Sequence, residues 1–226
     1  MRFRGVLFDL DGTLLDTAAD LAPALNAVLS EQGRATLPLE RIRPSVSHGA
    51  QALIELGFAD LSTTEREHLR QRLLAIYLAN ISVHTRPFPG VDTLIDLLDT
   101  RRIPWGIVTN KPARFTEPLL KDLGLHRRAR CAISGDSTEH PKPHPLPMLT
   151  AARHLGVAPQ DCLYVGDAER DVQAARNADM ACVVAGFGYL GADDDPNAWA
   201  ADAILDSPQA LLDWISAHLI KEPLCA

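Results

Sequence analysis

Four short groups of polar residues carry side chains that could perform chemistry, and each group follows an apolar stretch of the sequence. In chain order they are Asp9 with Asp11, Thr109 with Asn110, Lys142, and Asp167 with Asp171. Together they offer carboxylates, a hydroxyl, an amide and an ammonium group. Taken singly, each group is more often part of a loop or turn than of a catalytic site. Their joint appearance in this order makes four unrelated turns an implausible explanation.

The spacing of Asp9 and Asp11 favours a shared metal and phosphate site. At the end of a strand, side chains two residues apart project to the same side. Two carboxylates in one crevice repel each other unless a cation lies between them, and Asp167 adds a third oxygen donor. Such a hard, oxygen-rich cluster favours Mg²⁺ over zinc. A lysine and a hydroxyl in the same crevice can neutralise and hydrogen-bond a phosphoryl group, which is most of what phosphoryl transfer requires.

Short apolar runs alternate with helical patterns, which predicts an α/β fold with a Rossmann-like parallel sheet. The expected strands are 5–8, 104–108, 130–134, 162–165, 180–184 and 203–205. The expected helices between them are 92–100, 112–123, 145–155, 169–177 and 208–218. Residues just past the carboxyl ends of parallel strands converge on one crevice. The four polar groups are therefore expected to form a single site.

One stretch, residues 16–86, shows helical patterns and no convincing strand. The apolar residues that fall on single helical faces are Leu21, Leu25, Val28 and Leu29, and then Leu69, Leu73, Ile76 and Tyr77. We expect residues 16–86 to form a small α-helical cap domain, inserted into a catalytic core of residues 1–15 and 87–226. The cap is expected to open and close over the site, with hinges near 14–17 and 82–86.

Composition and charge exclude several classes of protein. The chain is 46% hydrophobic with a net charge of −7, which argues against nonspecific nucleic-acid or membrane partners. No apolar run approaches the ~20 residues needed to cross a bilayer, and the first residues do not read as a signal peptide. The scattered cysteines, Cys131, Cys162, Cys182 and Cys225, are expected to be three small core residues and one tail residue. A reducing, cytoplasmic location follows as the prediction.

The four motifs resemble those of the haloacid dehalogenase superfamily, and the match spans nearly the whole chain. They read FDLDGT at 8–13, IVTN at 107–110, Lys142 within HPKPHP, and VGDAERD at 165–171. The resemblance implies that Asp9 is a nucleophile that forms an aspartyl-phosphate and that Asp11 is the general acid and base. The further implied roles are Mg²⁺ binding by Asp9, Asp167 and the backbone carbonyl of Asp11, phosphate binding by Thr109, Asn110 and Lys142, and orientation of Lys142 or a metal-bound water by Asp171.

The branch of the superfamily is indicated by two further positions. An acid at Asp11 favours phosphate esters over carbon–halogen bonds, since the dehalogenases lack it. Leu21 stands where sugar mutases of the β-phosphoglucomutase type carry a histidine, and leucine cannot shuttle a proton. Segments 109–120 and 188–202 are similar to phosphoglycolate phosphatases. The implied function is Mg²⁺-dependent hydrolysis of a small phosphorylated metabolite, 2-phosphoglycolate to glycolate. The alternatives are an N-acetylmuramic acid 6-phosphate phosphatase of cell-wall recycling and a sugar phosphomutase.

The predicted cap departs from the phosphoglycolate phosphatase pattern on the loop expected to face the substrate. That pattern commonly reads V-G-N-G, whereas this chain has V-S-H-G at 46–49. We expect His48 and Arg43 to contact the substrate from the cap, with a surface or helix-capping role as the alternative for His48. The protein is expected to be a monomer or a homodimer. A phosphoacceptor signalling domain would be only ~120 residues long, and a non-catalytic relative would not need every motif residue.

Overall fold

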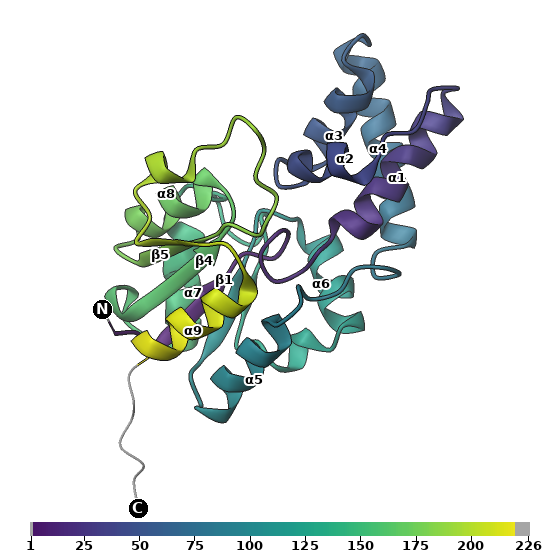
Figure 1. Cartoon of the computed structure of the whole chain (residues 1–226). Helices are drawn as coiled ribbons and strands as arrows, with labels where there is room; N and C mark the ends of the chain where they lie inside the picture. Colours follow the sequence, from purple (N-terminus) through teal and green to yellow (C-terminus); the bar gives the residue numbers. More distant parts are fainter. Residues whose placement is uncertain (1, 220–226) are drawn as a thin grey trace, which may run out of the picture.

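The computed structural model describes residues 2–219, and within them strands and helices alternate along the chain. The strands are β1 (Gly5–Phe8), β2 (Trp105–Val108), β3 (Ala132–Ile133), β4 (Cys162–Gly166), β5 (Ala181–Ala185) and β6 (Ala203–Leu205). They pair in parallel in the order β3-β2-β1-β4-β5-β6, of which β1, β4 and β5 are labelled in Figure 1. The predicted α/β fold with a parallel sheet is confirmed. The strand order changes direction at β1, which is where open α/β sheets form their binding crevice.

Helices cover both faces of the sheet, which explains why the strands are apolar throughout. Side chains alternate across β1, so Leu7 faces one layer while Val6 and Phe8 face the other. The Leu7 face packs against α7 (Leu146–Leu155) and α8 (Glu169–Asn177). The opposite face packs against α5 (Val91–Thr100), α6 (Ala113–Asp122) and α9 (Pro208–His218). The sheet edge that carries the polar groups is thereby held between two packed layers.

The edge strand β3 is shorter than its apolar run predicts. The prediction covered 130–134, but only Ala132 and Ile133 pair with β2. The chain leaves the ladder at Ser134, whose N–H donates to the hydroxyl of Ser137 at 3.0 Å. A local side-chain acceptor has replaced the strand partner at this point, as serine commonly does in turns.

A block of four helices lies beside the sheet, between β1 and α5 (Figure 1). Its members are α1 (Ala18–Glu31), α2 (Leu39–Val46), α3 (Gly49–Phe58) and α4 (Thr63–Ala79). The predicted apolar faces are buried, except that Ile76 is only partly covered. A capping box begins α4: Ser62 and Glu65 each accept a hydrogen bond from the other's backbone N–H. This helical block occupies most of the predicted cap.

The chain enters and leaves the helical block through two segments that lie side by side. Leu15 pairs with Pro87 in an antiparallel bridge, and the N–H of Asp16 donates to the carbonyl of Arg86 at 2.9 Å. The buried carboxylate of Asp20 accepts hydrogen bonds from the backbone of His84 and from the backbone and hydroxyl of Thr85. These bonds join α1 to the returning chain. The division at 16 and 86, and a hinge there, remain predictions that this pairing supports.

The structure bears on two expectations from the sequence: that the cysteines are small core residues, and that no segment crosses a bilayer. Cys131, Cys162 and Cys182 are free thiols, the latter two fully buried, whereas Cys225 lies outside the described residues. Among the helices of residues 2–219, none is both long and apolar enough to span a bilayer.

Candidate functional site

The structure brings all four polar groups to the carboxyl edge of the sheet. Asp9 directly follows β1 and is 3% exposed, with its N–H bonded to the carbonyl of Val165 on the neighbouring strand. Its Oδ1 atom accepts a hydrogen bond from the N–H of Leu10 at 2.7 Å and lies 3.0 Å from the Nζ of Lys142. One oxygen of Asp9 is therefore held by two donors, and the other has no hydrogen-bond partner among the described residues.

The ammonium group of Lys142 is the centre of a buried ionic cluster. Its Nζ lies 2.7 Å from Oδ1 of Asp171 and 3.0 Å from Oδ1 of Asp9. It also donates to the Tyr164 hydroxyl at 2.8 Å and to the Val108 carbonyl at 2.9 Å. The second oxygen of Asp171 accepts the N–H of Ala168 at 3.0 Å. This pairing is consistent with the orientation of Lys142 by Asp171, one of the two roles that the family resemblance implies for it.

Thr109 and Asn110 line the same cavity but differ in what they can offer a ligand. The Asn110 side-chain amide donates to the carbonyl of Lys142 and accepts from its N–H, both at 2.9 Å. This amide therefore fixes the Lys142 loop. The hydroxyl oxygen of Thr109 accepts the N–H of Lys111 at 3.2 Å, so its own hydrogen can be donated to a phosphoryl group.

Asp11 is held by two residues to which the sequence analysis assigned no role. Its Oδ1 accepts from the hydroxyl of Thr17 at 2.6 Å and lies 2.9 Å from the Nζ of Lys111. The same ammonium group is 4.6 Å from the ring centroid of Tyr77 on α4. Burial acts to lower the pKa of Lys111, but the Asp11 carboxylate and Tyr77 raise it more, so the ammonium stays charged. Its position directly after the Thr109-Asn110 pair was the signal available in the sequence.

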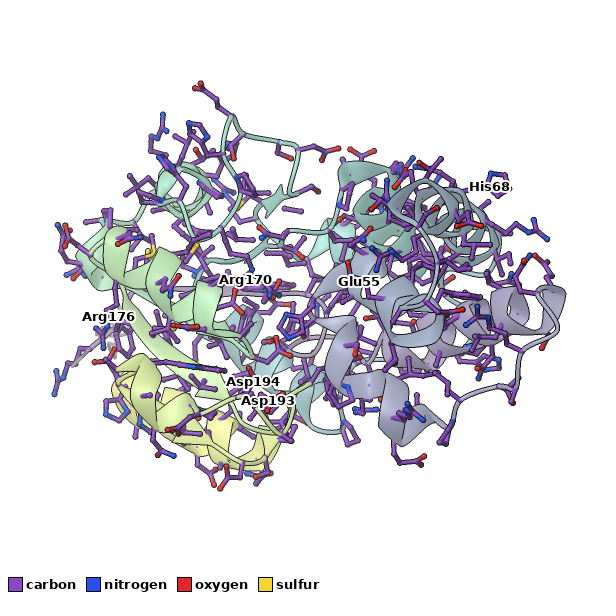
Figure 2. All side chains as sticks on the ribbon, turned by 90° about the horizontal axis from the view of Figure 1, so that it is seen from above. Glu55, His68, Arg170, Arg176, Asp193 and Asp194 are labelled. Carbon is purple, nitrogen blue, oxygen red and sulfur yellow. The ribbon has the colours of Figure 1, made fainter. Side chains whose placement is uncertain are left out.

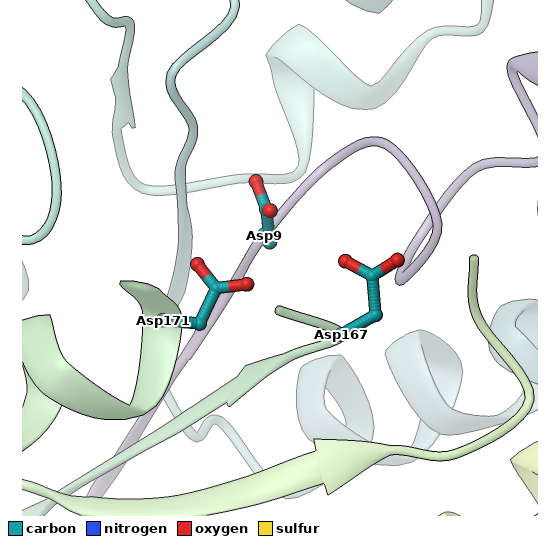
Figure 3. Close-up of side chains that lie close together, drawn as sticks. All are labelled: Asp9, Asp167 and Asp171. Carbon is teal, nitrogen blue, oxygen red and sulfur yellow. The ribbon is translucent and has the colours of Figure 1, made fainter. Parts of the chain in front are cut away.

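Three buried carboxylates could hold a cation between them. Oxygen atoms of Asp9, Asp167 and Asp171 lie within 4.8 Å of one another (Figure 3). Both oxygens of Asp171 are engaged, by Lys142 and by the N–H of Ala168, whereas Asp9 and Asp167 each keep one oxygen without a partner among the described residues and are the more suitable ligands. The Oδ1 atom of Asp167 is buried and has no hydrogen-bond partner among the described residues. A buried, unpartnered carboxylate oxygen beside a second carboxylate fits the oxygen-rich Mg²⁺ site predicted from the sequence.

Backbone geometry lets the carboxylates approach so closely. Gly12 has a φ of 79°, and a Cβ at this position would collide with the carboxylate of Asp167. Only glycine adopts this conformation without strain while leaving that space empty. The Gly in FDLDGT is therefore required both for the turn and for the contact with Asp167.

Burial raises the pKa of both candidate metal ligands. The pKa of Asp167 rises from 3.8 to about 7, with the negative charges of Asp9 and Asp171 adding to the effect of burial. Burial likewise raises the pKa of Asp9 to about 6, although the charge of Lys142 acts in the opposite direction. These shifts show that the site, without a cation, carries more negative charge than its surroundings stabilise.

The raised pKa values predict how metal and pH affect stability. A carboxyl whose folded pKa is raised contributes stability that is complete below about pH 4 and is lost as pH rises through about 6–7. The unfolding temperature of metal-free protein should therefore fall between pH 5 and pH 8. Mg²⁺ should restore it at pH 8, because binding requires deprotonated carboxylates.

Calorimetric unfolding scans with and without Mg²⁺ at both pH values measure this effect. At 100 times Kd the ligand contributes about 2.7 kcal/mol, or an increase of roughly 5–10 °C for a chain of this size. The Asp167→Asn variant is the matched control and should show little increase at either pH. An equal Mg²⁺-induced increase at pH 5 and pH 8 would contradict the prediction.

A cavity of about 480 Å³ connects this cluster with the helical block. Asp9, Asp11 and the 109–111 loop lie on the core side, while Leu21, Tyr77 and the 46–51 segment lie on the other. His48 lines the cavity and makes no side-chain cap bond to α3, which leaves its ring available to a ligand. Arg43 does not line it: its guanidinium pairs with Asp16 at 2.9 Å and lies over the Tyr189 ring. Arg43 is therefore not placed to make the substrate contact that the sequence analysis predicted for it.

Arg170 is a further cation of the site that sequence reasoning missed. It lies within VGDAERD, between two recognised aspartates, and lines the cavity. Its side chain lies on the part of the core that faces the helical block (Figure 2), where it donates to the Ser47 carbonyl at 2.7 Å. The neighbouring aspartates raise the pKa of Arg170 despite its burial, and its charge offsets theirs.

Comparisons with known proteins agree with this geometry. Residues 6–185 match a family model described as haloacid dehalogenase-like hydrolase. A phosphoglycolate phosphatase of Xanthomonas campestris pv. campestris (strain 8004) is 45% identical over 212 residues, covering 93% of this chain and 96% of that protein. An N-acetylmuramic acid 6-phosphate phosphatase of Pseudomonas aeruginosa is 38% identical over 220 residues, covering 97% of each. A crystal structure of a predicted phosphoglycolate phosphatase from Haemophilus somnus 129pt aligns with a TM-score of 0.82 at 26% identity, covering 95% of this chain and 98% of that one.

Proposed function

The chain belongs to the haloacid dehalogenase-like hydrolases, and from this premise we propose that it is a Mg²⁺-dependent phosphatase whose substrate is 2-phosphoglycolate. The proposal rests on the environment of the Asp9 carboxylate. Its carboxylate is buried at the edge of the cavity with one oxygen held by Leu10 and Lys142. The phosphatase prediction also agrees with the names of both relatives. A cytoplasmic location is part of the same proposal.

The proposed reaction has two steps. The free oxygen of Asp9 attacks phosphorus, the phosphorus–ester oxygen bond breaks, and Asp11 gives its proton to the departing oxygen. Asp11 then takes a proton from water, whose oxygen attacks the phosphorus of the aspartyl-phosphate and releases inorganic phosphate and the carboxylate of Asp9. Thr17 and Lys111 hold Oδ1 of Asp11, so Oδ2 is the atom that exchanges the proton.

Charge on the transferring phosphoryl group is the main energetic problem of this reaction. Lys142 and the hydroxyl of Thr109 stabilise its oxygens, and Asp171 keeps Lys142 aimed at Asp9. Mg²⁺ held by Asp9, Asp167 and the carbonyl of Asp11 would neutralise charge on both the phosphoryl group and the carboxylates. His48, and the loop on which it lies, close the cavity on the opposite side.

The carboxylate of 2-phosphoglycolate has a suitable partner in the cavity. Four cationic side chains line it, but three are engaged: Arg70 with Glu67, Lys111 with Asp11, and Arg170 with Ser47. The fourth, Arg114, lies over the Phe115 ring and has no hydrogen-bond or ion-pair partner within residues 2–219. It is exposed and follows the phosphate-binding loop by only a few residues. We assign the substrate carboxylate to Arg114.

The cavity is compatible with one of the two alternative functions and disfavours the other. A volume of about 480 Å³ is within the range of sites that take drug-sized ligands, so N-acetylmuramic acid 6-phosphate is the second candidate substrate. A sugar phosphomutase is disfavoured, because Leu21 lines the cavity and offers no group to move a proton.

Phosphate release from a small panel of esters tests the proposal. With Mg²⁺ present, kcat/KM for 2-phosphoglycolate should exceed that for 2-hydroxyethyl phosphate, which lacks the carboxylate, by roughly tenfold or more. A higher value for N-acetylmuramic acid 6-phosphate would assign the second candidate. Isomerised sugar phosphate would indicate a mutase, and no phosphate from any ester would overturn the phosphatase proposal.

Arg114→Ala is the matched variant for this panel. KM for 2-phosphoglycolate should rise about tenfold while the constants for 2-hydroxyethyl phosphate stay unchanged, since only the first ester has a charged partner for Arg114. Arg114→Lys should recover part of the loss. Equal effects on both esters would show that Arg114 does not bind the carboxylate.

A further inference from the structure

The loop between α2 and α3 is bonded to the core through one residue, Ser47. Its hydroxyl donates to Oδ2 of Asp167 at 2.8 Å, and its carbonyl accepts from the guanidinium of Arg170 at 2.7 Å. Both partners lie more than 100 residues further along the chain. Ser47 therefore joins the helical block directly to the aspartate cluster.

The two carboxylate oxygens of Asp167 differ in their hydrogen-bond partners. Oδ2 accepts from Ser47 and from the N–H of Tyr189 at 2.9 Å, whereas Oδ1 has no partner among the described residues although it is buried. Two donors on one oxygen fix the rotation of the carboxylate. Oδ1 is thereby left to bind the cation that is expected between Asp167 and Asp9.

We propose that Ser47 is a positioning residue that couples docking of the helical block to Mg²⁺ affinity. This inference rests on the metal site of the proposed function and goes beyond it, because it assigns part of the metal affinity to a residue outside the core motifs. A hydrogen-bond partner that orients a metal ligand strengthens binding, and its removal commonly costs 10–100-fold in affinity or activity. The coupling is reciprocal, so bound Mg²⁺ should also hold the loop more firmly on the core.

The same contact gives the departure from V-G-N-G a physical meaning. A glycine at position 47 has no hydroxyl and cannot reach Asp167, whereas serine can. Ser47 thus provides a bond from the helical block to Asp167 that a glycine, without a side chain, could not provide.

Titration calorimetry of the full-length chain with Mg²⁺ alone tests the proposal without relying on turnover. Ser47→Ala should raise the Mg²⁺ Kd about tenfold or more, and Ser47→Thr, which retains a hydroxyl, should recover part of the affinity. Ser45→Ala is the matched control: Ser45 lies on the last turn of α2, and its hydroxyl makes no hydrogen bond within residues 2–219. Its Kd should equal that of the wild type.

Hydrogen exchange supplies a second measurement that a merely structural serine would not affect. Mg²⁺ should slow amide exchange in 46–49 of the wild type and have a smaller effect in Ser47→Ala. Unchanged Kd in Ser47→Ala, or an equal loss in Ser45→Ala, would overturn the proposal while leaving the metal site intact. Absence of Mg²⁺ binding by the wild type would instead refute the metal site, and this inference with it.

Discussion

Asp9→Asn is expected to reduce kcat/KM for phosphate release by at least about 10⁴-fold, because removal of a covalent nucleophile eliminates the reaction path. Asparagine retains an oxygen that can accept from Leu10 and Lys142, so the local hydrogen bonds are preserved. The substitution should not destabilise the fold. Since burial raises the pKa of Asp9 to about 6, its charge at pH 8 destabilises the metal-free protein, and its removal should leave the unfolding temperature unchanged or higher.

The measurement is a steady-state assay beside an unfolding scan of the same preparations. Asp92→Asn, at an exposed position in the first turn of α5, makes the same chemical change at a residue that does not line the cavity and should retain full activity. Turnover of Asp9→Asn within tenfold of the wild type would refute Asp9 as the nucleophile. Loss of activity together with loss of folding would be inconsistent with the predicted preservation of the site.

Lys142→Met is expected to lower the free energy of unfolding by about 3–5 kcal/mol at pH 8 and to abolish turnover. The ammonium group is fully buried and pairs with Asp9 and Asp171, so its removal leaves two uncompensated buried carboxylates. The Val108 carbonyl and the Tyr164 hydroxyl lose a partner as well. Denaturant unfolding at constant pH measures the loss.

A second substitution separates the ionic effect from the change in packing. Asp171→Asn in the Lys142→Met background removes one of the two stranded charges, and the double variant should therefore be more stable than Lys142→Met alone. The two effects should be strongly non-additive, since the residues lie in direct contact. Additive losses would mean that the Lys142–Asp171 pair contributes no coupling. The double variant is not expected to regain activity, because it still lacks the Lys142 ammonium group that is proposed to bind the phosphate.

The sequence by itself determined the chemistry of the core and the parallel sheet. Three of the four motifs are local: an apolar strand is followed closely by the polar residue that it delivers, as in Phe8 to Asp9 or Val165 to Asp167, whereas Lys142 lies on the loop after β3. In a parallel sheet those residues must meet at one edge, so their convergence could be predicted without coordinates. The family resemblance then supplied the proposed role of each residue. The core helices and the apolar faces of α1 and α4 were equally predictable, since such faces repeat at helical spacing, whereas α2 and α3 were not distinguished within the helical stretch.

Only the tertiary structure decided which side chains pair across long distances in the chain. Lys111 and Asp11 lie 100 positions apart, and Ser47 and Asp167 lie 120 apart. Arg43 similarly pairs with Asp16 and stacks on Tyr189 instead of facing the cavity. No local pattern encodes such contacts: the Lys111–Asp11 pair depends on which loops the sheet brings together, and the contacts of Ser47 and Arg43 depend on how the helical block is seated on the core. The motifs thus specify the reacting atoms, while the packing of the two parts determines which neighbours hold them in place.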